Sequence, residues 1–336
     1  MLRRFFPIPL SIFFLFILSC GGCTNDPSTP ATTTPTNPVP KEVKVPKFNR
    51  DSAYFYTEKQ VAFGPRVPNT KEHTACKDWY VEKFKSLGAE VIEQDFQVKS
   101  FQNKMLNATN IIAQYNVDNP HRVILAAHWD SRHKAEQDKD EKKKEKPILG
   151  ADDGASGVGM LIEIARQIQA NGIDIGVDIV LFDAEDQGEN GGDETTWCLG
   201  SQHWSRNLHR SPYKPKFGIL LDMAGAKNAN FTKEGTSMQY APKVMDKVWK
   251  IAKERGYGNY FVDQRTGPIV DDHKFVNEIA RIPMIDIINR PAGSQTGFGP
   301  YWHTHNDNMS VINKNTLRAV GQTVLAAIYQ EAAGTF

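Results

Sequence analysis

The sequence has few cysteines and no excess of charge of either sign. It carries 4 cysteines in 336 residues, and its 40 Lys and Arg side chains nearly balance 39 Asp and Glu side chains. A nucleic-acid-binding protein would show a basic excess or patch, so the composition argues against that class of function. Two of the four, Cys20 and Cys23, lie near the N-terminus, and the rest of the chain, with Cys76 and Cys198 alone, has no CxxC motif and no cysteine-rich metal motif. Cys76 and Cys198 are expected to be separately buried thiols, although the sequence leaves a disulfide between them open.

Only the N-terminus carries a long, almost unbroken apolar run, residues 5–18, which follows Arg3 and Arg4. The run is short for a membrane-spanning helix, and with the small residues after it predicts a signal peptide over residues 1–22. Ile-Leu-Ser-Cys at residues 17–20 resembles a bacterial lipobox, which predicts lipidation at Cys20 or, as a weaker candidate, at Cys23. An ordinary cleaved signal peptide is the alternative. Either way we expect export, and with the lipid a periplasmic protein that contacts a membrane through its anchor alone.

Residues 23–47 are rich in Thr, Pro, Asn and Ser and have too few apolar side chains to fold, which predicts a flexible linker. The body, residues 48–336, shows no internal repeat and no second linker. A hydrophobic content of 40% is ample for a large core. We therefore expect one catalytic domain over residues 48–336, acting as a monomer.

Apolar runs and helical periodicities alternate along the body. Helices are expected over residues 51–63, 70–87, 155–170, 242–255 and 315–331, and strands over residues 89–98, 110–115, 122–127, 177–182, 217–223, 260–262 and 284–288. This alternation predicts a single α/β domain with a mostly parallel central sheet and helices on both faces. Residues 134–146 are dense in Lys, Glu and Asp, which predicts a mobile, solvated loop.

Residues able to bind a metal follow several of these strands. The apolar strand 177–182 runs into three carboxylates within residues 183–186. On its own this segment is as consistent with a solvated acidic loop as with a metal site. However, Asp186 of this segment is joined by ligand-type residues at other strand ends and loops, namely His128, Asp153, Asp222 and His303. Because the carboxyl ends of parallel strands meet at one edge, the fold would bring them together. His and carboxylate ligands suit zinc, and Glu185 would remain free as an acid or base.

Five short motifs carry a family resemblance: His128-Trp129-Asp130, Gly150-Ala151-Asp152-Asp153-Gly154, Asp183-Ala184-Glu185-Asp186, Leu220-Leu221-Asp222 and Trp302-His303-Thr304. Together they resemble the zinc-dependent aminopeptidase-like (M28) superfamily over nearly the whole body. Two branches compete, the di-zinc aminopeptidases and the animal-type glutaminyl cyclases (glutaminyl-peptide cyclotransferases), which also occur as exported proteins in Bacteroidetes-like bacteria. Three further motifs look like the cyclase branch: Asp271-Asp272-His273, residues 197–201, and Trp302 directly before His303.

The resemblance implies an enzyme that cyclises the N-terminal glutamine of peptides and proteins to pyroglutamate and releases ammonia. It implies one zinc ion per chain, held by Asp153, Asp186 and His303. Glu185 would be the general acid and base, and Asp271 would share its proton, with Asp222 and Asp286 in the same hydrogen-bond network. The implied substrate pocket consists of Trp197, Ile269, Phe298 and Trp302.

The chain departs from the animal cyclases at two positions. Glu185-Asp186 stands where they have Glu-Glu, and Asp286 replaces a His, which changes ligand length and the protonation of the network. A di-zinc aminopeptidase is the alternative, because His128 and Asp222 could complete a second metal site with Asp153 bridging. An anchored binding protein with a vestigial site is disfavoured, since Glu185 and every implied ligand are retained. His305 could replace His303 as a ligand, but the Trp-His-Thr context favours His303.

Overall fold

A computed structural model describes residues 43–336. The predicted signal peptide, the lipobox with Cys20 and Cys23, and most of the predicted linker lie outside the described residues. Among the described helices we find no apolar stretch long enough to span a bilayer.

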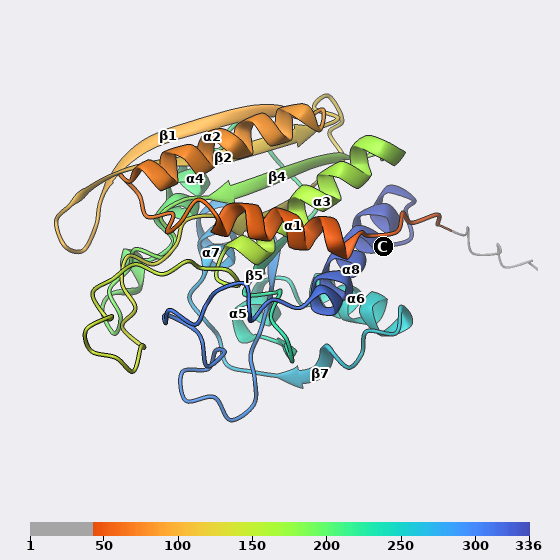
Figure 1. Ribbon diagram of the computed structural model, residues 1–336. Coiled ribbons are helices and arrows are strands. Elements are labelled where there is room, and N and C mark those ends of the chain that lie inside the picture. The colour runs from red at the N-terminus through yellow and green to blue at the C-terminus, as the bar shows by residue number, and fades with distance from the viewer. Residues whose placement is uncertain (1–42) are drawn as a thin grey trace, which may run out of the picture. The chain divides into compact units, whose positions relative to one another are not determined.

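A six-stranded sheet forms the centre of the body (Figure 1). Its spatial order is β1 (Glu90–Lys99), β2 (Met105–Tyr115), β4 (Gly176–Phe182), β3 (Arg122–His128), β5 (Gly218–Asp222) and β8 (Met284–Ile288). The β1–β2 and β2–β4 pairs are antiparallel, and the other three pairs are parallel. The prediction of a mostly parallel sheet is therefore confirmed, with an antiparallel hairpin at one edge.

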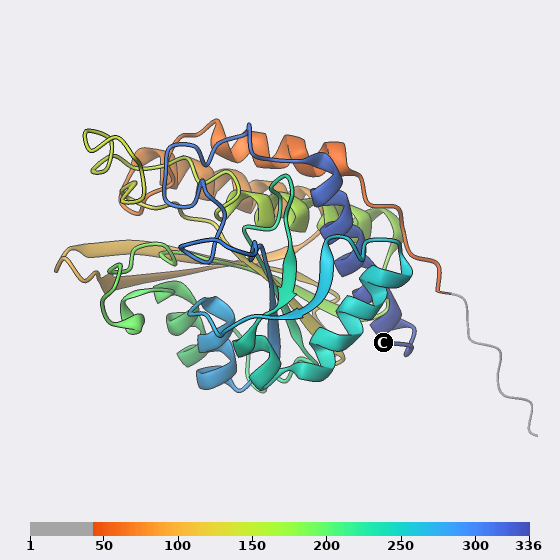
Figure 2. The same cartoon turned by 90° about the horizontal axis from the view of Figure 1, so that it is seen from below.

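Helices cover both faces of this sheet (Figure 2). On one side lie α1 (Arg50–Val61), α2 (Lys71–Ser86), α3 (Ala155–Asn171) and α8 (Lys314–Ala332), and on the other lie α4 (Leu199–Arg206), α5 (Gly235–Tyr240) and the short α7 (Asp272–Phe275). Further elements are α6 (Pro242–Glu254), the single turns η1 (Glu194–Thr196) and η2 (Val276–Ala280), and a small parallel pair of β6 (Phe231–Lys233) with β7 (Phe261–Arg265). The sequence did not predict α4, α5 or β6, which are short and lack a full period of apolar residues.

The strand alternation divides the core into two layers. Along β4, Ile179 and Leu181 belong to the larger cluster with α1, α2, α3 and α8, whereas Val180 and Phe182 belong to a smaller cluster on the opposite face. Successive strand residues point to opposite faces, so both faces of this strand are buried, as the apolar run 179–182 predicts. Gly157 lets α3 lie directly on the sheet, because a Cβ there would come within 2.3 Å of the Leu221 carbonyl oxygen.

One charged residue interrupts this apolar strand. Asp178 is fully buried, and Arg122 of the neighbouring β3 donates to it from Nε at 2.9 Å and from Nη2 at 2.5 Å. The Tyr213 hydroxyl donates to the same carboxylate at 2.7 Å. Burial opposes ionisation of Asp178, but the Arg122 guanidinium outweighs it and lowers the pKa of the carboxyl. The pair thus fixes the register of β3 against β4 at the end remote from His128.

Replacing Asp178 tests this pair. Asp178→Asn leaves the buried Arg122 charge uncompensated and should lower the free energy of unfolding at pH 7 by about 3–5 kcal/mol, measured by urea denaturation. Because the folded pKa of Asp178 lies below its unfolded value, its stabilisation is complete above the unfolded value and is lost as pH falls through the folded value. The stability gap between wild type and variant should therefore close in acid. Tyr213→Phe, which removes one hydrogen bond, is the control and should cost less; equal losses would contradict a dominant ion pair.

Candidate active site

The ends of parallel strands bring the predicted ligands to one edge of the sheet. β3 ends at His128, β5 ends at Asp222, and β4 ends directly before the carboxylate-rich residues 183–186. A cavity of about 420 Å³ opens at this edge, where α/β sheets bind their ligands. It is lined by Asp153, Glu185, Asp186, Trp197, Asp222, Ile269, Asp271, Phe298, Trp302 and His303. Of the other predicted site residues, His128 and Asp286 are buried beneath this lining.

Asp153, Asp186 and His303 form a compact, buried cluster. One ligand-type atom from each lies within 4.8 Å of the others, and His303 Nε2 is 3.1 Å from Asp186 Oδ1 and 3.9 Å from Asp153 Oδ2. Asp186 Oδ2 is buried without a hydrogen-bond partner in the described protein. Burial and the neighbouring Asp153 raise the pKa of Asp186 to about 6. Two carboxylates and one imidazole with an unpaired buried oxygen match the donor set of a catalytic zinc site.

Asp153 also belongs to a second cluster. Its Oδ1 lies 3.0 Å from His128 Nε2, and the same nitrogen lies 3.1 Å from Asp222 Oδ1. His128, Asp153 and Asp222 again place ligand-type atoms within 4.8 Å of one another. Burial raises the pKa of Asp222 to about 8. The two oxygens of Asp153 thus face two different clusters, which is the arrangement that a bridging carboxylate would need.

Glu185 points away from its neighbour Asp186. Ala184 has a left-handed backbone, φ 52°, which turns the chain between the strand and these two residues. Glu185 Oε1 accepts a hydrogen bond from the Cys198 thiol at 3.2 Å, while both backbone amides donate to Asp130, at 3.0 Å from Glu185 and 3.2 Å from Asp186. Burial raises the pKa of Glu185 well above its usual range, although the nearby His128 opposes this. Such a pKa suits a group that must both accept and donate a proton.

A chain of buried acids extends from Glu185. Glu185, Cys198 and Asp271 place ligand-type atoms within 4.8 Å of one another, and so do Asp271, His273 and Asp286. Asp271 caps α7 through the Asp272 amide at 2.5 Å, and its second oxygen has no partner among the described residues. Burial raises the pKa values of Asp271 and Asp286. His273 Nε2 lies 3.0 Å from Glu234 Oε1, so this imidazole pairs with Glu234.

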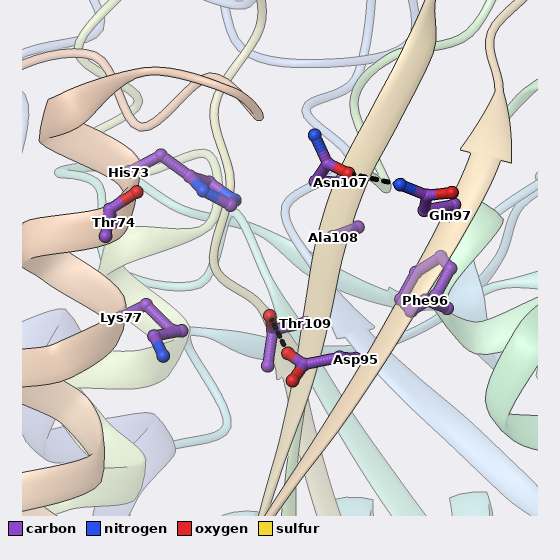
Figure 3. Close-up of a pocket in the computed structure, with 9 residues that line it drawn as sticks. All are labelled: His73, Thr74, Lys77, Asp95, Phe96, Gln97, Asn107, Ala108 and Thr109. Atoms are coloured by element: carbon purple, nitrogen blue, oxygen red, sulfur yellow. Dashed lines mark hydrogen bonds between the residues drawn. The ribbon is translucent and has the colours of Figure 1, made fainter.

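Asp183 supports the turn that presents Glu185 and Asp186. Its oxygens each lie 2.9 Å from His73 Nε2, and they accept the amides of Thr109 at 2.6 Å and Ala184 at 2.8 Å. A separate groove of about 620 Å³ lies between α2 and strands β1 and β2. Figure 3 shows His73 on the helix side of this groove and Thr109 on the strand side. His73 stacks on Trp129, which follows the β3 strand. These contacts explain why His73, one of the histidines without an assigned role, is buried.

Aromatic rings wall the cavity. The Trp302 ring stacks on His303 with centroids 3.7 Å apart, and Phe298 lies 4.9 Å from Trp302. The Trp197 ring faces His303 at 6.0 Å. Cys198 and His303, like Ala184, have a left-handed backbone conformation, with φ 55° and 54°. Residues strained in this way cluster at functional sites. Nothing in sequence periodicity signals these dihedral angles.

One sequence expectation near the site needs correction. Residues 134–146 are not uniformly solvated, because Ala135 is fully buried and Glu136 Oε1 lies 3.1 Å from His303 Nδ1. His305 bonds Asp138 at 2.9 Å and belongs to neither metal-type cluster, so the geometry favours His303 as predicted. Sequence reasoning missed Arg132 and Glu136, and it missed the Arg290 side chain in the cavity lining. Cys76 and Cys198 are separate free thiols, as expected.

The model of peptidase family M28 matches residues 110–328. The chain belongs to this family. It is similar to the solved structure of Bacteroides thetaiotaomicron glutaminyl cyclase bound to N-acetylhistamine, with 52% identity, 85% of this chain and 99% of that chain covered, and a TM-score of 0.83. It is also similar to a Zn-dependent exopeptidase from Parabacteroides distasonis, with 49% identity, 85% and 99% covered, and a TM-score of 0.84. Drosophila melanogaster glutaminyl-peptide cyclotransferase is 25% identical over 277 residues, 75% of this chain and 73% of that protein.

These similarities confirm three predictions. The resemblance to the M28 superfamily and to bacterial glutaminyl cyclases is confirmed by the family match and by structures about half identical in sequence. The α/β fold is confirmed over 85% of the chain. The expectation of an enzyme of the glutaminyl-peptide cyclotransferase kind is confirmed as well.

Proposed function

We propose that this M28 protein is a zinc-dependent glutaminyl-peptide cyclotransferase with one zinc ion per chain. Its substrates would be peptides and proteins with an N-terminal glutamine, and its products pyroglutamyl peptides and ammonia. The observation that carries the proposal is the position of Glu185. This carboxyl, with its raised pKa, stands beside the Asp153, Asp186 and His303 cluster in a cavity walled by Trp197, Trp302 and Phe298.

The reaction requires a pocket that holds a neutral side chain and a group that moves one proton. The α-amine of the glutamine attacks the carbon of its own side-chain amide, a C–N bond forms, and the bond to the leaving nitrogen breaks. Because no water takes part, an apolar aromatic pocket is compatible with the chemistry. We infer that Trp197, Ile269, Phe298 and Trp302 hold the side chain. Glu185 takes the proton from the attacking amine and returns it to the departing ammonia.

The surrounding acids would tune Glu185. Asp271 lies within reach of it, and Asp286 extends the same buried cluster, so these carboxyls can share protons rather than all ionise. Asp222 contributes the same kind of partly neutral carboxyl from β5. A zinc ion bound by Asp153, Asp186 and His303 would polarise the amide carbonyl and stabilise the negative charge that develops on its oxygen. We propose that the enzyme acts as a monomer.

A di-zinc aminopeptidase remains the second candidate function. The observation that favours it is the cluster of His128, Asp153 and Asp222, with a second oxygen of Asp153 already turned toward it. The chain is also 49% identical to a Zn-dependent exopeptidase from Parabacteroides distasonis, which supports this alternative. Hydrolysis would need a nucleophilic water at the site, whereas cyclisation does not.

A paired peptide assay distinguishes the two functions. The purified protein should convert a Gln-initiated peptide to its pyroglutamyl form, with loss of 17 Da by mass spectrometry (roughly the mass of the ammonia that cyclisation expels) and release of ammonia. A Leu-initiated peptide of otherwise identical sequence should remain intact, because it has no side-chain amide to attack.

Metal content supplies the control for this assay. The active protein should retain about one zinc ion per chain after dialysis, as expected for three protein ligands and an open position. Release of free leucine from the Leu-initiated peptide, together with a stable two-zinc form, would establish the aminopeptidase instead.

Glu185→Gln tests the division of roles within the Glu185-Asp186 pair. The variant cannot move the proton, so kcat for the Gln-initiated peptide should fall by about 10²–10⁴-fold while zinc remains bound. Asp186→Ala is the matched variant and should lose zinc. If Glu185→Gln loses the metal and Asp186→Ala keeps it, the two roles are exchanged.

We also propose that the chain is exported and anchored to a bacterial membrane through Cys20 or Cys23. The apolar run after Arg3 and Arg4, the lipobox-like residues 17–20 and the polar linker support this proposal. Mass spectrometry of the mature N-terminus from a membrane fraction should show a diacylated cysteine at one of the two positions, and Cys20→Ala with Cys23→Ala should release the protein in soluble form. An unmodified N-terminus would indicate an ordinary cleaved signal peptide.

A further inference from the structure

A buried ion pair stands behind the candidate zinc ligands. Arg132 follows β3, is fully buried, and binds the Glu136 carboxylate with Nε at 3.1 and 3.2 Å and with Nη2 at 2.6 Å. Glu136 is largely buried as well, with 14% of its side chain exposed. The geometry is that of a forked guanidinium–carboxylate pair, which fixes both side chains more firmly than a single contact would.

The carboxylate of this pair contacts His303 on the ring nitrogen remote from the cluster. Glu136 Oε1 lies 3.1 Å from His303 Nδ1, while Nε2 faces Asp186 Oδ1 at 3.1 Å. A carboxylate accepting from Nδ1–H leaves Nε2 as the nitrogen with a free lone pair. It therefore selects the tautomer, and holds the ring plane, that a metal bound at Nε2 requires.

The guanidinium of the pair reaches two further parts of the site. Arg132 Nη1 donates to the backbone carbonyl oxygens of Asp186 at 2.9 Å and of Gly188 at 2.8 Å. Its central carbon lies 4.5 Å from the centre of the Trp197 ring, in cation–π contact. One cation thus touches the backbone of a second candidate ligand and the wall of the substrate cavity.

The backbone of the same segment reinforces this contact. The Gln137 amide donates to the His303 carbonyl oxygen at 3.1 Å. Residues 136–137 are therefore held to His303 at the backbone as well as through the imidazole. The segment that composition marked as solvated is packed against the loop that carries His303.

We propose that Arg132 and Glu136 are positioning residues that couple zinc affinity to the shape of the glutamine pocket. Glu136 orients His303 for the metal, and Arg132 holds Glu136, the Asp186 backbone and Trp197 in one arrangement. The inference rests on the proposed zinc site. It predicts an effect on metal binding that is measurable without any turnover, so it can stand if the cyclisation assay fails.

Zinc affinity, measured by competition with a chromogenic chelator, is the primary test. Removal of a residue that orients a metal ligand typically weakens metal binding by about 10–100-fold. Glu136→Ala should show a loss in this range. Glu136→Gln, which has the same shape and retains an acceptor oxygen but no charge, should lie between Glu136→Ala and wild type.

Asp138→Asn is the matched control. Asp138 lies in the same segment and bonds His305 Nδ1 at 2.9 Å, but His305 belongs to neither metal-type cluster. This variant should bind zinc as tightly as wild type, within about twofold. If it weakens zinc binding as much as Glu136→Ala, the segment acts only through its folding and the proposal is wrong. An unchanged zinc affinity of Glu136→Ala would also show that the proposal is wrong. If Glu136→Ala does not fold, the zinc affinity of Glu136→Gln is the test of the proposal.

Arg132→Lys tests the coupling to the pocket. Lysine retains the charge but cannot reproduce the fork, the two carbonyl contacts and the ring contact together. It should raise KM for a Gln-initiated peptide more than it lowers kcat, and the visible spectrum of the Co²⁺-substituted protein should shift from that of wild type. A spectrum and a KM both unchanged would show that Arg132 has no positioning role. If the wild-type protein cyclises no peptide, the proposed function is wrong. If the Glu136 variants of that protein still bind zinc more weakly than wild type, the positioning role of Glu136 stands.

Discussion

Mutual repulsion among buried carboxylates is the constraint on which the rest of this site depends. Asp153, Glu185, Asp186, Asp222 and Asp271 all line one cavity at the carboxyl edge of the sheet. Ionised acids so close together are costly without counter-charge, and here some are kept neutral while others are paired. The fold meets this cost with the imidazoles of His128 and His303, and a bound cation would add to them. Burial, and after it the neighbouring Asp186 and Asp271 carboxylates, raise the pKa of Glu185, which suits a group that must accept and donate a proton.

The sequence predicted the parts of the site that follow from strand patterning. An unbroken apolar strand ends where its polar residues begin, so the positions of Asp186 after β4 and Asp222 at the end of β5 on one edge follow from the pattern of residues alone. Residues that act through loops gave no such signal. Arg132 and Glu136 sit among many other charged residues, and Arg290 stands alone in a loop, so only the fold decides which charged side chains reach the site.

Residues 134–146 show most clearly where prediction from composition fails. Its density of Lys, Glu and Asp is typical of solvated loops, and composition averages over its residues. The structure divides it instead, with Ala135 and Glu136 packed inward and Lys139, Lys142, Lys143 and Lys146 exposed. In the same way, the short elements α4, α5 and β6 have too few residues for a periodic pattern, yet α4 supports the loop that carries Cys198 beside Glu185.

Asp130 holds the backbone of both Glu185 and Asp186 in place. Because the amides of both residues donate to this one carboxylate, the backbone beneath them cannot shift for one residue without shifting for the other. The length of the side chain at position 186 therefore determines how far its carboxyl reaches into the cavity. A Glu at this position would carry its carboxyl one methylene further from the backbone than Asp186 does. A change of side-chain length at position 186 would therefore change the depth of the pocket on an unchanged backbone.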